Sequence, residues 1–190
     1  MDVLAHTLWA NAGARGANAL AEKGNKEKKN KFHMSPGWTA FWGVFPDLFA
    51  FTIPFIVRFY SVIFLGDSFA KVFGKPQIVE GGIPEGFKLA LVLYDYSHSL
   101  VIWAVVFIIV WIIFKRPRYE LLGWALHILI DIPTHVIAFF PTPLFFPLSD
   151  YKFPYGIQWS NQWFMITNYV LLLIVWGKIL FSKYKSKLFH

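Results

Sequence analysis

Hydrophobic residues are concentrated along this chain in four long segments, at about residues 38–65, 89–114, 119–140 and 160–182. Each segment is near or above the roughly 20 apolar residues that an α-helix needs to cross a bilayer. The pattern therefore predicts an all-α polytopic membrane protein, a bundle of about four transmembrane helices. Residues 2–20 are rich in Ala and Gly and contain Arg15, so we expect there an interfacial or half-inserted helix.

Composition agrees with this pattern. Hydrophobic residues make up 56% of the chain and charged residues only 15%, whereas an ordinary soluble domain is about one quarter charged. The chain has no cysteine, which excludes disulfides, iron-sulfur clusters and thiolate zinc sites. Its 190 residues form one structural domain, in which the motifs described below occupy residues 1–158 and the last span with its basic tail occupies residues 159–190.

Lysine and arginine cluster beside the apolar segments, within residues 23–31, 115–118 and 183–187, and the net charge is +7. Under the positive-inside rule all three clusters are cytoplasmic, which four spans with both termini inside satisfy. The connections 66–88 and 141–159 then face outward. Because topology explains the charge, we expect membrane lipid as the partner and no nucleic acid.

Several histidines and aspartates fall inside apolar segments, where ionisable groups are costly. His127, Asp131 and His135 recur every four residues, a spacing that places them on one helix face. Four more residues lie in other segments that are largely apolar: His6, Asp47, Asp95 and His98. Imidazole and carboxylate together suit zinc, manganese or iron. We therefore expect the bundle to bring several of these groups to a divalent cation.

Helix geometry tests whether these groups can meet. With a rise of about 1.5 Å per residue, Asp47, His127 and Asp131 lie roughly 12–18 Å from the cytoplasmic starts of their spans, and His98 lies roughly 24 Å from its start. A spread of about two turns is loose for one ion, and two ions about 3.5–4 Å apart fit it better. Pro133 should also kink the helix between Asp131 and His135.

Four short motifs occur in order along the chain, with His6 before them: Val44–Asp47, Tyr96–Ser99, His127–Thr134 and Phe146–Phe153. In this arrangement the chain resembles the YdjM-like family of membrane-bound metal-dependent hydrolases over roughly residues 1–158. That family in turn looks like a remote relative of zinc-dependent phospholipases C and related phosphodiester nucleases. The resemblance implies metal ligands at His6, Asp47, His98, His127 and Asp131. His135 is a further candidate ligand because of its spacing from Asp131.

The resemblance and the ligand chemistry together predict a membrane-embedded hydrolase that cleaves an ester. The preferred substrate is a phosphoester of a lipid-like molecule. One or two zinc ions, with manganese as the alternative, would activate water. A carboxylate that is not needed as a ligand, Asp131 or Asp95, is the expected base. Lys152 in the outer loop is a candidate for pairing with phosphate. We expect the protein in a prokaryotic inner membrane, with both termini cytoplasmic.

Two other functional classes stay open. His98 and His127 could clamp a b-type haem in an electron carrier, although haem requires no carboxylate. The buried histidines and aspartates could instead relay ions or protons in a transporter, for which the chain shows no clear internal repeat. A purely structural role, in which the same groups form hydrogen bonds between helices, is the third alternative.

Overall fold

The computed structural model describes residues 1–24, 32–68 and 85–188. This part of the chain is helical, with one isolated bridge between Val136 and Phe139 and no longer strand. Its elements are α1 (Val3–Gly24), α2 (Pro36–Phe64), α4 (Glu85–Ser97), α5 (Leu100–Phe114), η1 (Tyr119–Leu121), α6 (Leu122–Thr134) and α7 (Gln162–Leu188). The predicted all-α class is confirmed for these residues.

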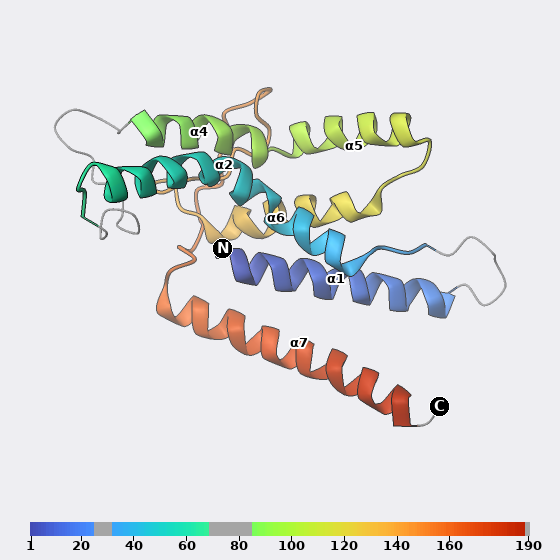
Figure 1. Ribbon diagram of the computed structural model, residues 1–190. Helices are drawn as coiled ribbons and strands as arrows, with labels where there is room; N and C mark the ends of the chain where they lie inside the picture. The colour runs from blue at the N-terminus through green and yellow to red at the C-terminus, as the bar shows by residue number, and fades with distance from the viewer. Residues whose placement is uncertain (25–31, 69–84, 189–190) are drawn as a thin grey trace.

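The long helix α2 is the centre of the arrangement, because it packs against α1, α4 and α6. Figure 1 shows the helices running side by side, with α4 and α5 along one edge and α7 along the other. The main packing partner of α7 is α1. Asp47 lies on α2, and His6, His127 and Asp131 lie on α1 and α6, which pack against it. His98 and His135 directly follow the ends of α4 and α6.

The described residues contain fewer candidate spans than the four that the sequence predicts. Within the part of the chain that the structure describes, α2 and the Gln162–Lys185 part of α7 are long and apolar enough to cross a membrane. Lys88–Ser97 and Leu100–Phe114 qualify only together, as one span bent by 58°. These two to three helices make a membrane protein plausible.

The predicted span 119–140 is not one long helix, which accounts for the missing fourth span. Helix α6 has only 13 residues and ends at Thr134, and His135 has extended backbone angles. Pro133 lacks an N–H group and disfavours a continued helix. The carbonyl oxygens of Pro133 and Thr134 instead accept hydrogen bonds from the N–H groups of Ile157 and Trp159, at 2.8 and 2.9 Å. The irregular segment 135–161 is thus tied back to the end of α6.

The predicted apolar segment 89–114 is also interrupted, at His98. Ser99 caps the second half, since its hydroxyl oxygen accepts hydrogen bonds from the N–H groups of Val101 and Ile102 at 3.1 and 3.3 Å. Serine is among the preferred N-cap residues because its side chain satisfies an otherwise unpaired backbone donor. The break turns the chain at His98 and places this residue beside α6.

The basic residues gather at one end of the bundle, as the charge pattern predicts. Figure 1 shows the end of α1, the start of α2, the end of α5, the start of α6 and the end of α7 at the same side of the view. Among the described residues this end carries Lys23, Lys115, Arg116, Arg118 and Lys183. The rest of the first cluster, residues 25–31, and most of the connection 66–88 lie outside the described residues. Which face of the membrane the basic end occupies stays a prediction.

Candidate metal centre

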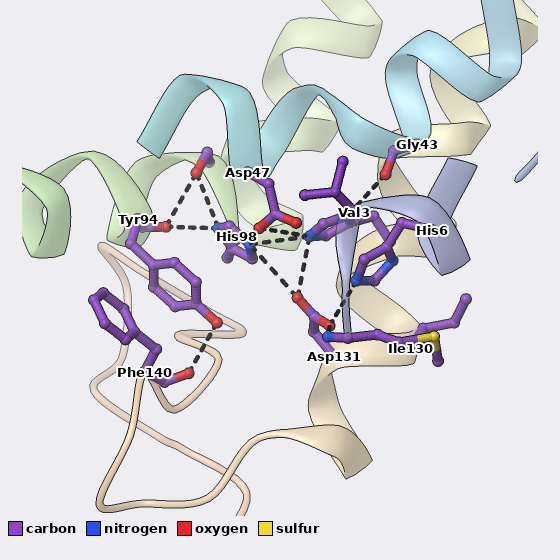
Figure 2. A network of polar contacts seen from close by, with 12 residues as sticks. Val3, His6, Gly43, Asp47, Tyr94, His98, Ile130, Asp131 and Phe140 are labelled. Carbon is purple, nitrogen blue, oxygen red and sulfur yellow. Dashed lines mark hydrogen bonds and ion pairs between the residues drawn. The ribbon is translucent and has the colours of Figure 1, made fainter. Parts of the chain in front are cut away.

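Four of the predicted ligands meet at one point in the bundle. Asp47 comes from the middle of α2, His98 from the break between α4 and α5, and His127 and Asp131 from α6. One ligand atom from each residue lies within 4.8 Å of all the others. Figure 2 shows Asp47, His98 and Asp131 turned toward this common point.

The closest contacts in the group join the two histidines to Asp131. The Nε2 atoms of His98 and His127 lie 3.0 Å apart. The Oδ2 atom of Asp131 is 3.0 Å from Nε2 of His127 and 3.5 Å from Nε2 of His98. Asp47 is slightly further away, with its Oδ1 atom 3.6 Å from Nε2 of His98 and 3.7 Å from Nε2 of His127.

Backbone carbonyl groups fix the orientation of both imidazoles. The Nδ1 atom of His127 lies 2.8 Å from the carbonyl oxygen of Gly43, and that of His98 lies 3.3 Å from the carbonyl oxygen of Tyr94. A carbonyl oxygen only accepts hydrogen bonds, so Nδ1 of His127 carries the proton and its Nε2 presents a lone pair. Nδ1 of His98 also lies 2.9 Å from the hydroxyl oxygen of Ser97, and because that hydroxyl donates to the carbonyl oxygen of Tyr94 at 3.4 Å, we assign the same tautomer to His98. This pattern, with one ring nitrogen held by the backbone, is typical of histidines that bind metals.

With both rings in this tautomer neither Nε2 atom carries a proton, and the buried group contains acceptors and no donor. Two imidazole lone pairs and two carboxylate oxygens converge, and Oδ2 of Asp131 has no hydrogen-bond partner although it is buried. Buried acceptors and charges of this kind are costly unless a positive charge meets them. A divalent cation would satisfy all four at once, and two imidazoles with two carboxylates suit zinc or manganese. The residues present therefore fit the predicted metal.

A second set of groups surrounds the other oxygen of Asp131. Oδ1 lies 3.0 Å from Nε2 of His6 and 3.5 Å from Nδ1 of His135. The amino group of Met1 donates a hydrogen bond to the same oxygen at 2.6 Å. The His6 ring stacks on the His127 ring with 3.6 Å between their centroids. Asp131 thus connects the four-ligand group to both remaining predicted ligands.

His6 and His135 lie outside the candidate spans, and burial lowers the pKa of each to about 4. Both rings are therefore neutral at neutral pH. The Nδ1 atom of His6 has no hydrogen-bond partner, and its Nε2 atom faces Oδ1 of Asp131. Neutral imidazole is the form that binds metals, so both side chains are in the state that a second ion would require.

The other two residues with predicted catalytic roles lie apart from this group. Asp95 is half-buried on α4, and its strongest electrostatic neighbours are Lys152 and Asp150 in the segment 135–161. Among the described residues the group of metal-type ligands consists of Asp47, His98, His127 and Asp131. The structure thus brings Asp95 and Lys152 to each other's vicinity but does not place them among the ligands.

Two contacts at the site have no counterpart in the sequence prediction. The Tyr94 ring stacks on the His98 ring at 3.7 Å between centroids, and its hydroxyl donates to the carbonyl oxygen of Phe140 at 2.9 Å. Figure 2 shows Tyr94 between His98 and the Phe140 loop. An aromatic residue in an apolar segment looks like ordinary membrane packing, and the carbonyl of Gly43 leaves no mark in a sequence. Neither contact had a signal that could have revealed it.

Comparison of the chain with protein-family models, with curated proteins and with solved structures finds no match. The resemblance to the YdjM-like family therefore stays a prediction that rests on the four motifs. The arguments below use the geometry of the site instead.

Proposed function

We propose that this chain is a membrane-embedded hydrolase that depends on a divalent cation and cleaves a phosphoester or other ester of a lipid-like substrate. The observation that carries the proposal is the convergence of the Nε2 atoms of His98 and His127 with carboxylate oxygens of Asp47 and Asp131. Interhelical hydrogen bonding alone does not account for it, because a donor would have to stand opposite each acceptor. With Nδ1 protonated on both rings, the four side chains present acceptors to one another.

Two cation positions follow from the contacts of Asp131. The first is held by Asp47, His98, His127 and Oδ2 of Asp131. The second is at Oδ1 of Asp131 with His6 and His135, where a cation would take the place of the Met1 amino group. A bound divalent cation lowers the pKa of water and offsets negative charge on a reacting oxygen. Zinc is the proposed metal and manganese the alternative.

Burial indicates how reactants approach. The side chains of His98, His127 and Asp131 are at most 1% exposed, whereas that of Asp47 is 13% exposed. Water and substrate therefore reach the group past Asp47 on α2. Because α2 is a candidate span, this approach lies beside the hydrocarbon of the membrane and suits a substrate with an apolar part.

The role of the carboxylates follows from their positions. Asp131 contacts both sets of histidines, so we assign it to binding cations and not to proton transfer. Asp95 remains available as a base only if the substrate extends from the metal group toward Lys152, where a phosphate oxygen would find a positive charge. Asp95 and Lys152 are accordingly proposed to contact substrate away from the cations.

The haem alternative receives no support from the geometry. With metal-nitrogen bonds of roughly 2 Å on each side, two axial imidazoles need their nitrogens about 4 Å apart across a porphyrin. The Nε2 atoms of His98 and His127 lie 3.0 Å apart with carboxylates beside them. Ion transport is distinguished from hydrolysis by the activity measurement that follows.

Chelation and a charge-removing substitution test the proposal. Detergent-purified protein should cleave a chromogenic phosphodiester or a short-chain phospholipid, lose this activity with a chelator and regain it with zinc or manganese. Asp47→Asn should lower activity by roughly 100-fold or more, since it keeps the size of the side chain and removes a ligand charge. The matched control is Glu22→Gln, which removes a charge from an exposed position near the end of α1 and should retain wild-type activity. Activity that survives both thorough chelation and Asp47→Asn would overturn the proposal.

A further inference from the structure

Two consecutive polar residues of helix α7, Asn168 and Tyr169, make hydrogen bonds to α1 and to Asp2, the residue before it. The indole Nε1 of Trp9 donates to Oδ1 of Asn168 at 2.8 Å. The hydroxyl of Tyr169 donates to Oδ1 of Asp2 at 2.9 Å. Figure 1 shows α7 lying along α1 at the edge of the bundle. These two consecutive residues tie the candidate span to the N-terminal helix.

The two hydrogen bonds bracket the candidate ligand His6. Asp2 lies four residues before His6 and Trp9 three residues after it, so each tie is within about one helical turn. Asn168 is only 7% exposed, and a buried amide is costly in an apolar environment unless it is hydrogen-bonded. The polar contacts of α7 are therefore concentrated at the level of the metal centre.

Asp2 connects the hydroxyl of Tyr169 to the backbone that carries His6. The Asp2 side chain also accepts a hydrogen bond from the N–H group of Ala5 at 2.9 Å, and its carbonyl accepts one from the N–H group of His6 at 3.1 Å. Asp2 is thus the N-terminal cap of α1. A continuous series of contacts runs from Tyr169 through Asp2 and His6 to Asp131.

The four-ligand group does not depend on this series in the same way. Its members come from α2, α6 and the break between α4 and α5. The main packing partner of α7 is α1. A change at the α1–α7 contact should therefore reach His6 before it reaches Asp47, His98 or His127.

We propose that Asn168 and Tyr169 are positioning residues for the second cation, holding α1 so that His6 meets Oδ1 of Asp131. This inference rests on the proposed function, because it assumes that cations bind at both oxygens of Asp131. It assigns to α7 a role in the site although no α7 side chain is among the candidate ligands. The alternative is that the two hydrogen bonds contribute only to the stability of the bundle.

The test compares wild-type protein with Asn168→Leu/Tyr169→Phe and with Tyr184→Phe, which removes a hydroxyl from an exposed position of the same helix. Each purified protein is loaded with zinc and dialysed against a graded series of chelator concentrations. Zinc per chain is measured by elemental analysis, and thermal unfolding of each protein is followed in parallel. We expect two zinc ions per chain in wild-type protein and in Tyr184→Phe, and one tightly held ion in the double variant with at least a tenfold weaker second ion.

Each other outcome has a defined meaning. Two ions held equally well by the double variant, or a single ion in both proteins, would overturn the positioning role and leave the proposed function in place. Parallel loss of both ions with a lowered unfolding temperature would show a purely structural role and would also overturn it. Wild-type protein that binds no zinc or manganese would instead overturn the proposed function.

Discussion

Asp131 is the residue whose two oxygens face different sets of partners. Oδ2 faces His98 and His127, and Oδ1 faces His6, His135 and the amino group of Met1. The side chain is about 1% exposed, so water cannot replace any of these partners. Its removal therefore affects both proposed cation positions at once.

Substitution of a single buried ligand should lower the metal content of the protein, whereas substitution of an exposed histidine should not. We expect His127→Ala and Asp131→Ala each to lower bound zinc by at least half, because each removes a metal ligand that no neighbouring side chain can replace. His33→Ala is the control, since His33 is exposed and lies before α2. Elemental analysis of the purified variants measures the effect. Equal metal content in all three variants would contradict the site.

Residue spacing predicted the α6 part of the site well. A period of four placed His127 and Asp131 on one face, and their Nε2 and Oδ2 atoms are 3.0 Å apart. His135 lies beyond the end of α6, yet its Nδ1 atom remains 3.5 Å from Asp131. Spacing could not predict the carbonyl partners of the imidazoles, because they depend on how closely α2 approaches α6.

At the scale of elements, that close approach depends on two glycines. A Cβ atom at Gly123 of α6 would overlap the carbonyl oxygen of Thr39 in α2, and one at Gly43 would overlap the Cβ atom of Ala10 in α1. The backbones of α6 and α2 therefore meet with no side-chain carbon between them, and Ala10 of α1 packs its methyl group against Gly43. The carbonyl of Gly43 that orients His127 lies in this contact.

Gly123→Ala should disturb both packing and metal binding. The added methyl group must separate α6 from α2, and overpacking of this kind costs roughly 1–3 kcal/mol. Gly16→Ala and Gly177→Ala are controls, because nothing lies within 4 Å of a Cβ atom at either position. We expect lower thermal stability and weaker zinc binding in Gly123→Ala alone. Wild-type values in this variant would mean that the helices are not in such close contact.

The prediction of elements failed where helices stop or break. Straight spans implied ligands spread over about two turns, but the break at His98 and the contact of α6 with α2 bring the ligand atoms within 4.8 Å of one another. Ser99 is a typical N-cap residue, but the apolar residues on both sides of it favoured the prediction of one continuous span. Near Pro133 the sequence predicts a kink, but α6 ends there, at Thr134.

At the scale of the whole molecule, the charge pattern predicts opposite sides for two loops. Lys115 lies at the basic end of the bundle, after α5, and Lys152 lies in the segment between α6 and α7. Because the chain has no cysteine, Lys115→Cys and Lys152→Cys each provide one labelling site. An impermeant thiol reagent applied to intact cells should label position 152 and leave position 115 unlabelled until the membrane is permeabilised. Labelling of both from one side would contradict the predicted topology.

The number of spans is the whole-molecule property that the sequence misjudged. Hydropathy alone cannot distinguish a long apolar helix from a short helix followed by an irregular apolar segment, as in residues 119–140. The side-by-side grouping of basic residues was predictable, since it follows from charge and chain order alone (Figure 1).

The distribution of ligands over separate helices also has a consequence for biosynthesis. Domains are made from the N-terminus onward, so the ribosome delivers His6 and Asp47 first and Asp131 and His135 last. Asp47 enters the membrane with α2 while its imidazole partners have not yet been translated. Its carboxylate gains all of its companions only after α6 has been inserted. Under the proposed function, cation loading is therefore expected as a late step of maturation, and nascent chains that stop before α6 would carry an uncompensated acidic group.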